Sequence, residues 1–173
     1  MIVAVASDHA GVELKGGLVA RLRRARFRVL DLGTHRPDPV DYPDYARALA
    51  GSILARKAAR GLLICGSAVG VSVAANKFRG IRAAVCHDAY SARQGVEHDD
   101  LNVLCLGARV IGEELAWMLV ETFLAARFSG APRHRRRLKK VLEIEAETMK
   151  PGPSLRGEAA QAVAVGTGKR DPR

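Results

Sequence analysis

The sequence predicts an α/β protein, a Rossmann-like three-layer α/β/α sandwich with a five-stranded parallel sheet. Short apolar runs of strand length alternate along the chain with longer segments in which apolar residues recur at helical spacing. This alternation is the order of right-handed βαβ units, which build parallel sheets covered by helices on both faces. The length of 173 residues suits one such domain with a full core.

The first half of the chain contains three of the expected strands. Asp41 can cap a helix that tolerates Pro43 in its first turn. The expected elements, in order, are a strand over 2–6, a helix over 12–26, a strand over 28–32, a helix over 42–59, a strand over 61–65 and a helix over 69–76.

The second half continues the alternation and ends in a segment of different composition. The expected elements are a strand over 81–86, a helix over 89–96, a strand over 102–106 and helices over 113–126 and 133–149. Residues 150–173 are rich in Gly, Ala and Pro, which predicts a disordered basic tail after a domain of residues 1–149.

The net charge of +10 is concentrated near the C-terminus. Residues 127–142 hold seven Lys and Arg and no Asp or Glu, whereas the body of the chain is neutral. The basic segment has no interleaved aromatic residues, so we expect no nucleic-acid partner.

The cysteines and the apolar runs indicate in which cellular compartment the protein is expected. Cys65, Cys86 and Cys105 form no C-x-x-C pair, which argues against a disulfide framework or a structural zinc site. No apolar run is long enough to span a bilayer, and the N-terminus lacks the basic segment of a signal peptide. We therefore expect a cytoplasmic protein that does not associate with membranes.

Polar residues follow several of the predicted strands, at the edge where parallel α/β sheets bind ligands. They are Ser7-Asp8-His9 after the first strand, Cys65-Gly66-Ser67 after the third, His87-Asp88 after the fourth and Arg109 after the fifth. His98 and Asp99 are expected in a loop before the fifth strand that returns towards this edge.

The spacing alone supports two interpretations of Cys65 equally well. It precedes a glycine-containing turn and a helix start, where backbone amides attract anions and lower the pKa of a thiol. It can equally be a packed core residue.

The other candidates also have simpler explanations. Asp8 can be a helix N-cap, and His9 and His98 can be surface histidines. Arg133 and Arg137 lie four residues apart on one helix face, which suits gripping a phosphate, although such basic runs usually face solvent.

Taken together, these segments resemble the ribose-5-phosphate isomerase B family, whose superfamily includes galactose-6-phosphate isomerase subunits. The resemblance covers about residues 1–148 and is carried by many segments in the right order. They are Ser7-Asp8-His9-Ala10-Gly11, Asp41-Tyr42-Pro43-Asp44-Tyr45-Ala46, ICGSAVGVSVAANK from Ile64 to Lys77, Gly80-Ile81-Arg82-Ala83, His98-Asp99-Asp100, Asn102-Val103-Leu104, Gly107-Ala108-Arg109-Val110 and Arg133-His134.

The resemblance implies an aldose–ketose isomerisation of the pentose phosphate pathway, through an enediolate and without metal or cofactor. By the same resemblance, Cys65 is the proton-transfer base, His98 opens the sugar ring and Ser67 bonds the sugar oxygens. Implied substrate-binding residues are Asp8, His9, Gly66, Ala68, Val69, Gly70, Asp99, Arg109, Arg133 and Arg137, the three arginines meeting the phosphate. The family forms homodimers with shared active sites, and some members pair further into tetramers.

Two residues depart from the family pattern within the expected site. Asp99 stands where the family usually has Asn, and a carboxylate would repel an enediolate. Ala68 replaces a usual Gly, so the turn must avoid positive φ or accept strain. Two alternatives therefore stay open: the same chemistry on allose 6-phosphate, galactose 6-phosphate or a tetrulose phosphate, or a non-catalytic phosphosugar-binding homologue.

Overall fold

The five strands form one parallel sheet in the order β2-β1-β3-β5-β4. This computed structural model describes residues 1–149, so the predicted tail lies outside the described residues. The strands are β1 (Ile2–Ser7), β2 (Arg28–Asp31), β3 (Arg60–Cys65), β4 (Ala83–Val85) and β5 (Val103–Gly107).

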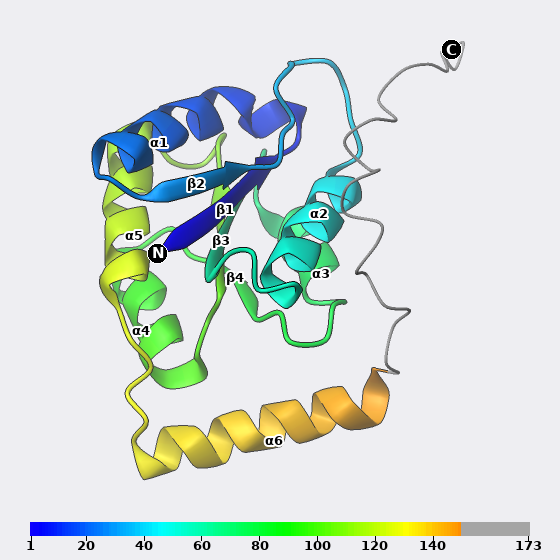
Figure 1. The fold of residues 1–173 in the computed structure, drawn as a ribbon, viewed down its shortest axis with the longest axis vertical. Coiled ribbons are helices and arrows are strands. Elements are labelled where there is room, and N and C mark those ends of the chain that lie inside the picture. The colour runs from blue at the N-terminus through cyan, green and yellow to red at the C-terminus, as the bar shows by residue number, and fades with distance from the viewer. Residues whose placement is uncertain (150–173) are drawn as a thin grey trace.

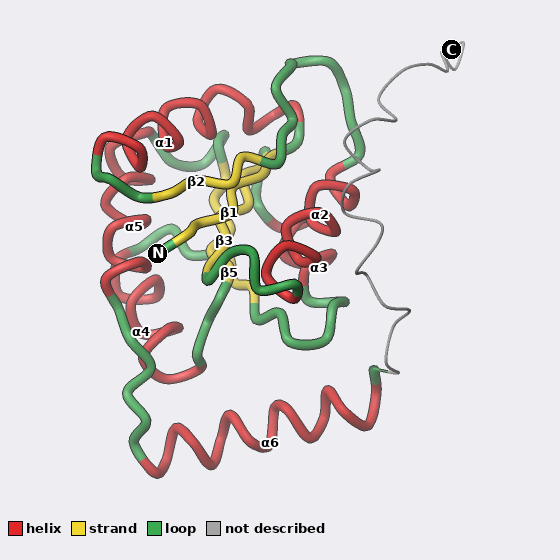
Figure 2. Tube along the Cα trace, in the orientation of Figure 1, coloured by secondary structure: helices red, strands yellow, loops and turns green. Residues whose placement is uncertain are grey.

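Helices cover both faces of the sheet, which confirms the three-layer α/β/α prediction (Figure 1). One face is covered by α1 (Val12–Arg24), α4 (Ala89–Asp99) and α5 (Glu113–Ala125), and the other by α2 (Tyr42–Leu54) and α3 (Val69–Ala75). A short 3₁₀ turn, His9–Gly11, precedes α1. The last helix, α6 (Pro132–Thr148), lies outside these layers, below them in Figure 2.

The core is divided by the sheet because side chains of successive strand residues point to opposite faces. Val3 and Val5 pack towards α1 and α5, whereas Ala4 and Ala6 pack towards α2. All four are fully buried, as expected for a parallel sheet with two covered faces.

The strand register defines two edges of the sheet. Gly61 pairs with Val103 at the amino edge, and Cys65 pairs with Gly107 at the carboxyl edge. Since a strand rises roughly 3.3 Å per residue, the two edges lie about 13 Å apart. This separation decides which site residues one chain can bring together.

Several predicted boundaries were wrong. The helix expected over 42–59 ends at Leu54, because Arg56 adopts a left-handed backbone with a φ of 57°. The helix expected over 89–96 continues to Asp99 and ends only where Asp100 takes a φ of 53°. Neither stop is marked by a glycine, the residue that usually signals it.

Within residues 1–149, none of the helices is long and apolar enough to cross a bilayer.

Gly11 is expected to tolerate no side chain. A Cβ atom there would lie 2.7 Å from Cγ2 and 2.8 Å from the backbone carbon of Ile64, so Gly11→Ala must displace β3. We expect it to lower the free energy of unfolding by about 1–3 kcal/mol in urea titrations.

Gly16→Ala in the first helix is the matched control. A Cβ atom there meets nothing within 4 Å, so alanine should raise the free energy of unfolding by about 0.5–1 kcal/mol. Equal stability of the Gly11→Ala variant and the wild type would contradict the close packing of this turn on β3.

Candidate active site

The carboxyl edge of the sheet brings the Cys65 thiol to the Asp8 carboxylate. The thiol donates a hydrogen bond to Oδ2 of Asp8 over 2.8 Å. The other carboxylate oxygen accepts from the amides of Ala10 at 3.0 Å and Gly11 at 3.2 Å. Asp8 is therefore the N-cap of the short turn, as the simpler reading predicted, and in addition it is a fixed partner for the thiol.

The electrostatic surroundings of Cys65 differ from those expected from the sequence. Burial raises the pKa of its thiol, and the hydrogen bond to Asp8 and the negative charge of Asp8 raise the pKa further. The amides of Gly66 and Ala68 act in the opposite direction and are outweighed. Because burial and Asp8 outweigh these amides, the expectation that the helix start lowers the pKa of Cys65 was wrong for the single chain.

The turn after Cys65 is strained at Ala68. This residue adopts a φ of 69°, in the left-handed region, so of the two expected outcomes the turn accepts strain rather than avoiding positive φ. An alanine in this region costs roughly 1–2 kcal/mol relative to glycine's freedom there. Its methyl group is nevertheless fully buried and belongs to the core beneath α2 and α3.

The same turn lies between two other segments. The backbone amide of Arg109 donates to the carbonyl of Gly66 over 3.0 Å, and a Cβ atom at Gly66 would lie 3.6 Å from Cδ of Arg109. Tyr42, at the start of α2, covers Gly70 so closely that a Cβ atom there would lie 2.9 Å from the ring. Ser67 and Val69 are exposed beside them.

Two histidines face this edge with one ring nitrogen already committed. His9 Nδ1 accepts from the amide of Val40 over 3.2 Å, which leaves Nε2 as the protonated nitrogen. His87 Nε2 accepts from the amide of Gly107 over 3.0 Å. His87 is half-buried, and this bond holds the end of β5.

A second group of predicted site residues lies at the amino edge. His98 and Asp99 are the last residues of α4 rather than part of a returning loop. The ring of His98 stacks against that of His134 in α6 at 3.9 Å between centroids, and its Nδ1 lies 2.8 Å from Nε2 of Gln94.

His134 orients the start of α6. It is 3% exposed, its Nδ1 bonds the Ser129 hydroxyl at 2.6 Å, and its Nε2 accepts from Nε of Arg133 at 3.0 Å. Burial and the neighbouring positive charges, His98 first, lower the pKa of His134. Arg133 and Arg137 are both exposed next to it.

The structure of one chain therefore divides the predicted site into two groups. Asp8, His9, the turn from Cys65 to Gly70 and Arg109 gather at the carboxyl edge, and His98, Asp99, Arg133 and Arg137 gather near the amino edge. The register places these edges about 13 Å apart, beyond any direct contact between Cys65 and His98.

Neither group resembles a metal site. Among residues 1–149 no cluster of three His, Cys, Asp or Glu side chains could hold an ion. That the chemistry needs no metal or cofactor stays a prediction.

Sequence reasoning gave no role to Tyr42 and His134, although both belong to quoted motifs. Tyr42 contacts Gly70 of the turn that follows Cys65, and His134 contacts His98. Their positions depend on packing between elements distant in sequence, and no spacing within either motif indicates it.

Comparison with known proteins gives a family match over most of the chain. The sequence model of the Ribose/Galactose Isomerase family matches residues 3–141. The ribose-5-phosphate isomerase B of Escherichia coli K12 is 44% identical over 143 residues, which are 83% of this chain and 95% of that protein.

Solved structures agree in fold as well as in sequence. The ribose-5-phosphate isomerase B of Clostridium thermocellum superposes with a TM-score of 0.83 at 44% identity, covering 85% of this chain and 99% of that one. The Mycoplasma genitalium enzyme, solved with bound ribulose-5-phosphate, gives a TM-score of 0.80 at 38% identity, covering 85% and 97%.

The Asp8→Asn variant should shift the titration of Cys65 to lower pH. It removes a negative charge that repels the thiolate and an acceptor that stabilises the thiol, and both changes lower the pKa of Cys65. Iodoacetamide alkylation rates measured against pH report the midpoint, with Cys65→Ser identifying the reaction at Cys65. The pKa of Cys86 is raised to about 11, so alkylation of Cys86 is expected at higher pH than alkylation of Cys65. An unchanged or higher midpoint would show that Asp8 does not control the thiol.

Proposed function

Because the chain belongs to the ribose/galactose isomerase family, we propose that it interconverts D-ribose 5-phosphate and D-ribulose 5-phosphate through an enediolate. That the chain is an isomerase follows from this membership. The observation that carries the proposal is the Cys65 thiol, held 2.8 Å from Asp8 at the carboxyl edge where α/β sheets bind ligands. The cytoplasmic location expected from the cysteines stays a prediction.

The proposed chemistry uses Cys65 as a base and then as an acid. Its thiolate takes the proton from C2 of the open-chain aldose, leaving an enediolate across C1 and C2. The resulting thiol returns that proton to C1, while a hydroxyl proton moves from O2 to O1, and the product is the ketose. Amides between Gly66 and Gly70, with the Ser67 hydroxyl, are the donors available to the enediolate oxygens.

We further propose that two copies of the chain complete each active site. His98, the proposed ring-opening residue, lies near the amino edge of the sheet, opposite the edge of Cys65. The proposed phosphate-binding pair, Arg133 and Arg137, lies near the same amino edge. In a homodimer they serve the Cys65 of the other copy. The positive charge of the two arginines then offsets the negative charge of Asp8 and lowers the pKa of Cys65, which is raised in the single chain.

A second substrate class is favoured by one residue. Asp99 is exposed directly after His98 and carries a charge where the family usually has an amide, which alters the polarity near the sugar. Allose 6-phosphate, galactose 6-phosphate or a tetrulose phosphate are then the alternative substrates. A comparison of kcat/KM across these sugars, for the wild type and Asp99→Asn, decides between them.

The Cys65→Ser variant should lose kcat by about 10²–10⁴-fold on ribose 5-phosphate, the usual contribution of a positioned base. A coupled assay of ribulose 5-phosphate formation measures the loss. Cys86→Ala, which removes a thiol from β4's end instead, is the control and should stay active. Turnover by Cys65→Ser near the wild-type rate would exclude Cys65 as the base.

Mixing two inactive variants tests the shared site. Cys65→Ala and His98→Ala chains, unfolded together and refolded, should regain about a quarter of wild-type activity, because half the dimers are mixed and each has one intact site. The same variants refolded separately are the controls. If the mixture stays as inactive as its components, each chain must build its site alone.

A further inference from the structure

The helix α6 is held to the rest of the chain by few contacts. Of its 17 residues only His134 is buried. Val141, Leu142 and Ile144 are 51%, 40% and 59% exposed, so apolar burial within this chain does not fix its direction. Polar contacts near its two ends must therefore set its position.

The first attachment is at the start of the helix. The ring of His134 stacks on that of His98, at the end of α4. In the segment before the helix, the amide of Ser129 donates to the carbonyl of Glu97 over 2.9 Å. A single anchored end lets a helix swing about it.

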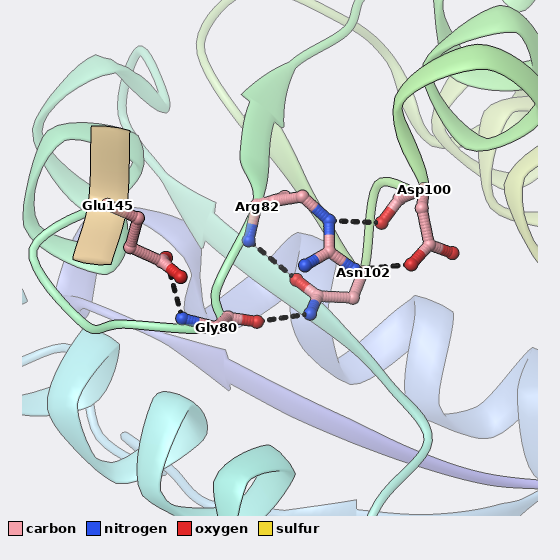
Figure 3. A network of polar contacts seen from close by, with 5 residues as sticks. All are labelled: Gly80, Arg82, Asp100, Asn102 and Glu145. Carbon is pink, nitrogen blue, oxygen red and sulfur yellow. Dashed lines mark hydrogen bonds and ion pairs between the residues drawn. The ribbon is translucent and has the colours of Figure 1, made fainter. Parts of the chain in front are cut away.

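The second attachment is a polar network near the other end of α6 (Figure 3). Glu145 accepts from the amide of Gly80 over 2.7 Å, and the Gly80 carbonyl accepts from Nδ2 of Asn102 over 2.8 Å. Oδ1 of Asn102 accepts from the amide of Arg82 over 2.8 Å. The Arg82 side chain then donates to the carbonyl of Asp100 over 2.7 Å and pairs with its carboxylate at 2.5 Å.

The polar network from Glu145 ends at α4, the helix that also contacts the start of α6. Asp100 is the C-cap of α4, directly after His98 and Asp99. His134 and Glu145 are eleven residues apart, so α6 is held at two points about 16 Å apart along its axis. Two such points fix the direction of the helix, whereas one does not.

We propose that Glu145 and Arg82 are positioning residues of the active site. Through Gly80 and Asn102 they fix α6 against the end of α4, and so hold Arg133 and Arg137 in a constant relation to His98. Neither residue is among the predicted site residues. The expected effects on KM and kcat rest on the proposed function, whereas the expected effects on hydrogen exchange do not.

The Glu145→Ala variant tests the link to α6. Hydrogen exchange should become faster at the Gly80 amide and in the C-terminal half of α6, because the carboxylate that holds that amide is gone. Displacement of the arginines should raise KM for ribose 5-phosphate about 5-fold, with kcat near wild type, and weaken binding of inorganic phosphate similarly.

Two matched variants distinguish the loss of the hydrogen bond between Glu145 and Gly80 from a general loss of charge on α6. Glu145→Gln keeps an acceptor oxygen and should restore exchange and KM. Glu147→Ala removes an exposed carboxylate from the same helix and should change neither. Unchanged exchange and KM in Glu145→Ala, or equal effects of Glu147→Ala, would overturn the proposal.

The Arg82→Gln variant tests the link to α4. It breaks the tie to Asp100, so the expected effect is on the proposed ring-opening residue: kcat falls about 5-fold and KM changes less. Arg79→Gln, an exposed change in the same loop, is the control. A uniform loss of stability with unchanged kcat would show a merely structural role.

The structural readout keeps the two proposals distinguishable. If the wild type turned over no phosphosugar, the proposed function would fall. Exchange at Gly80 and α6, and the affinity for inorganic phosphate, would still decide whether Glu145 positions the helix.

Discussion

The direction of the chain in a parallel sheet is the constraint on which the site depends. Every crossover helix begins at the carboxyl edge and ends at the amino edge, because the next strand must start there. Cys65 ends a strand and His98 ends a crossover helix, so one chain places them at opposite edges. Under the proposed mechanism both groups act on one sugar, and this separation is the reason for proposing that two chains each supply one edge.

The same division explains the electrostatics of Cys65. In one chain the thiol lies next to the buried carboxylate of Asp8 and the backbone amides of Gly66 and Ala68. Burial and the carboxylate raise the pKa of the thiol by more than the amides lower it. The cationic groups that would favour a thiolate are gathered around α6. Under the proposed shared site, these groups come from the other copy and would lower the pKa of Cys65 there.

The sequence predicted the parts of this structure that depend on local pattern. Apolar runs located all five strands, and Asp8 and Cys65 were expected at one edge because strand ends are readable from composition. His98 was misplaced because α4 ends without glycine, at an aspartate in the left-handed conformation. The pKa of Cys65 was misjudged because the field of a short helix start is readable from sequence, whereas the burial and the Asp8 contact are products of tertiary packing.

The position of α6 shows why polar contacts matter where a core is lacking. Elements inside the three layers are positioned by fully buried side chains such as Leu62 and Phe123. Because many such contacts act together, the loss of one changes the position of an element little. Within the chain α6 buries only His134, so we infer that the bond from the Gly80 amide to the Glu145 carboxylate helps to place its far half. The proposal that Arg133 and Arg137 bind the phosphate requires close placement, because a misplacement of about 1 Å can cost about 10²-fold in rate. Under that proposal a helix outside the core needs attachment at more than one point, and the contacts of Glu145 and His134 provide two.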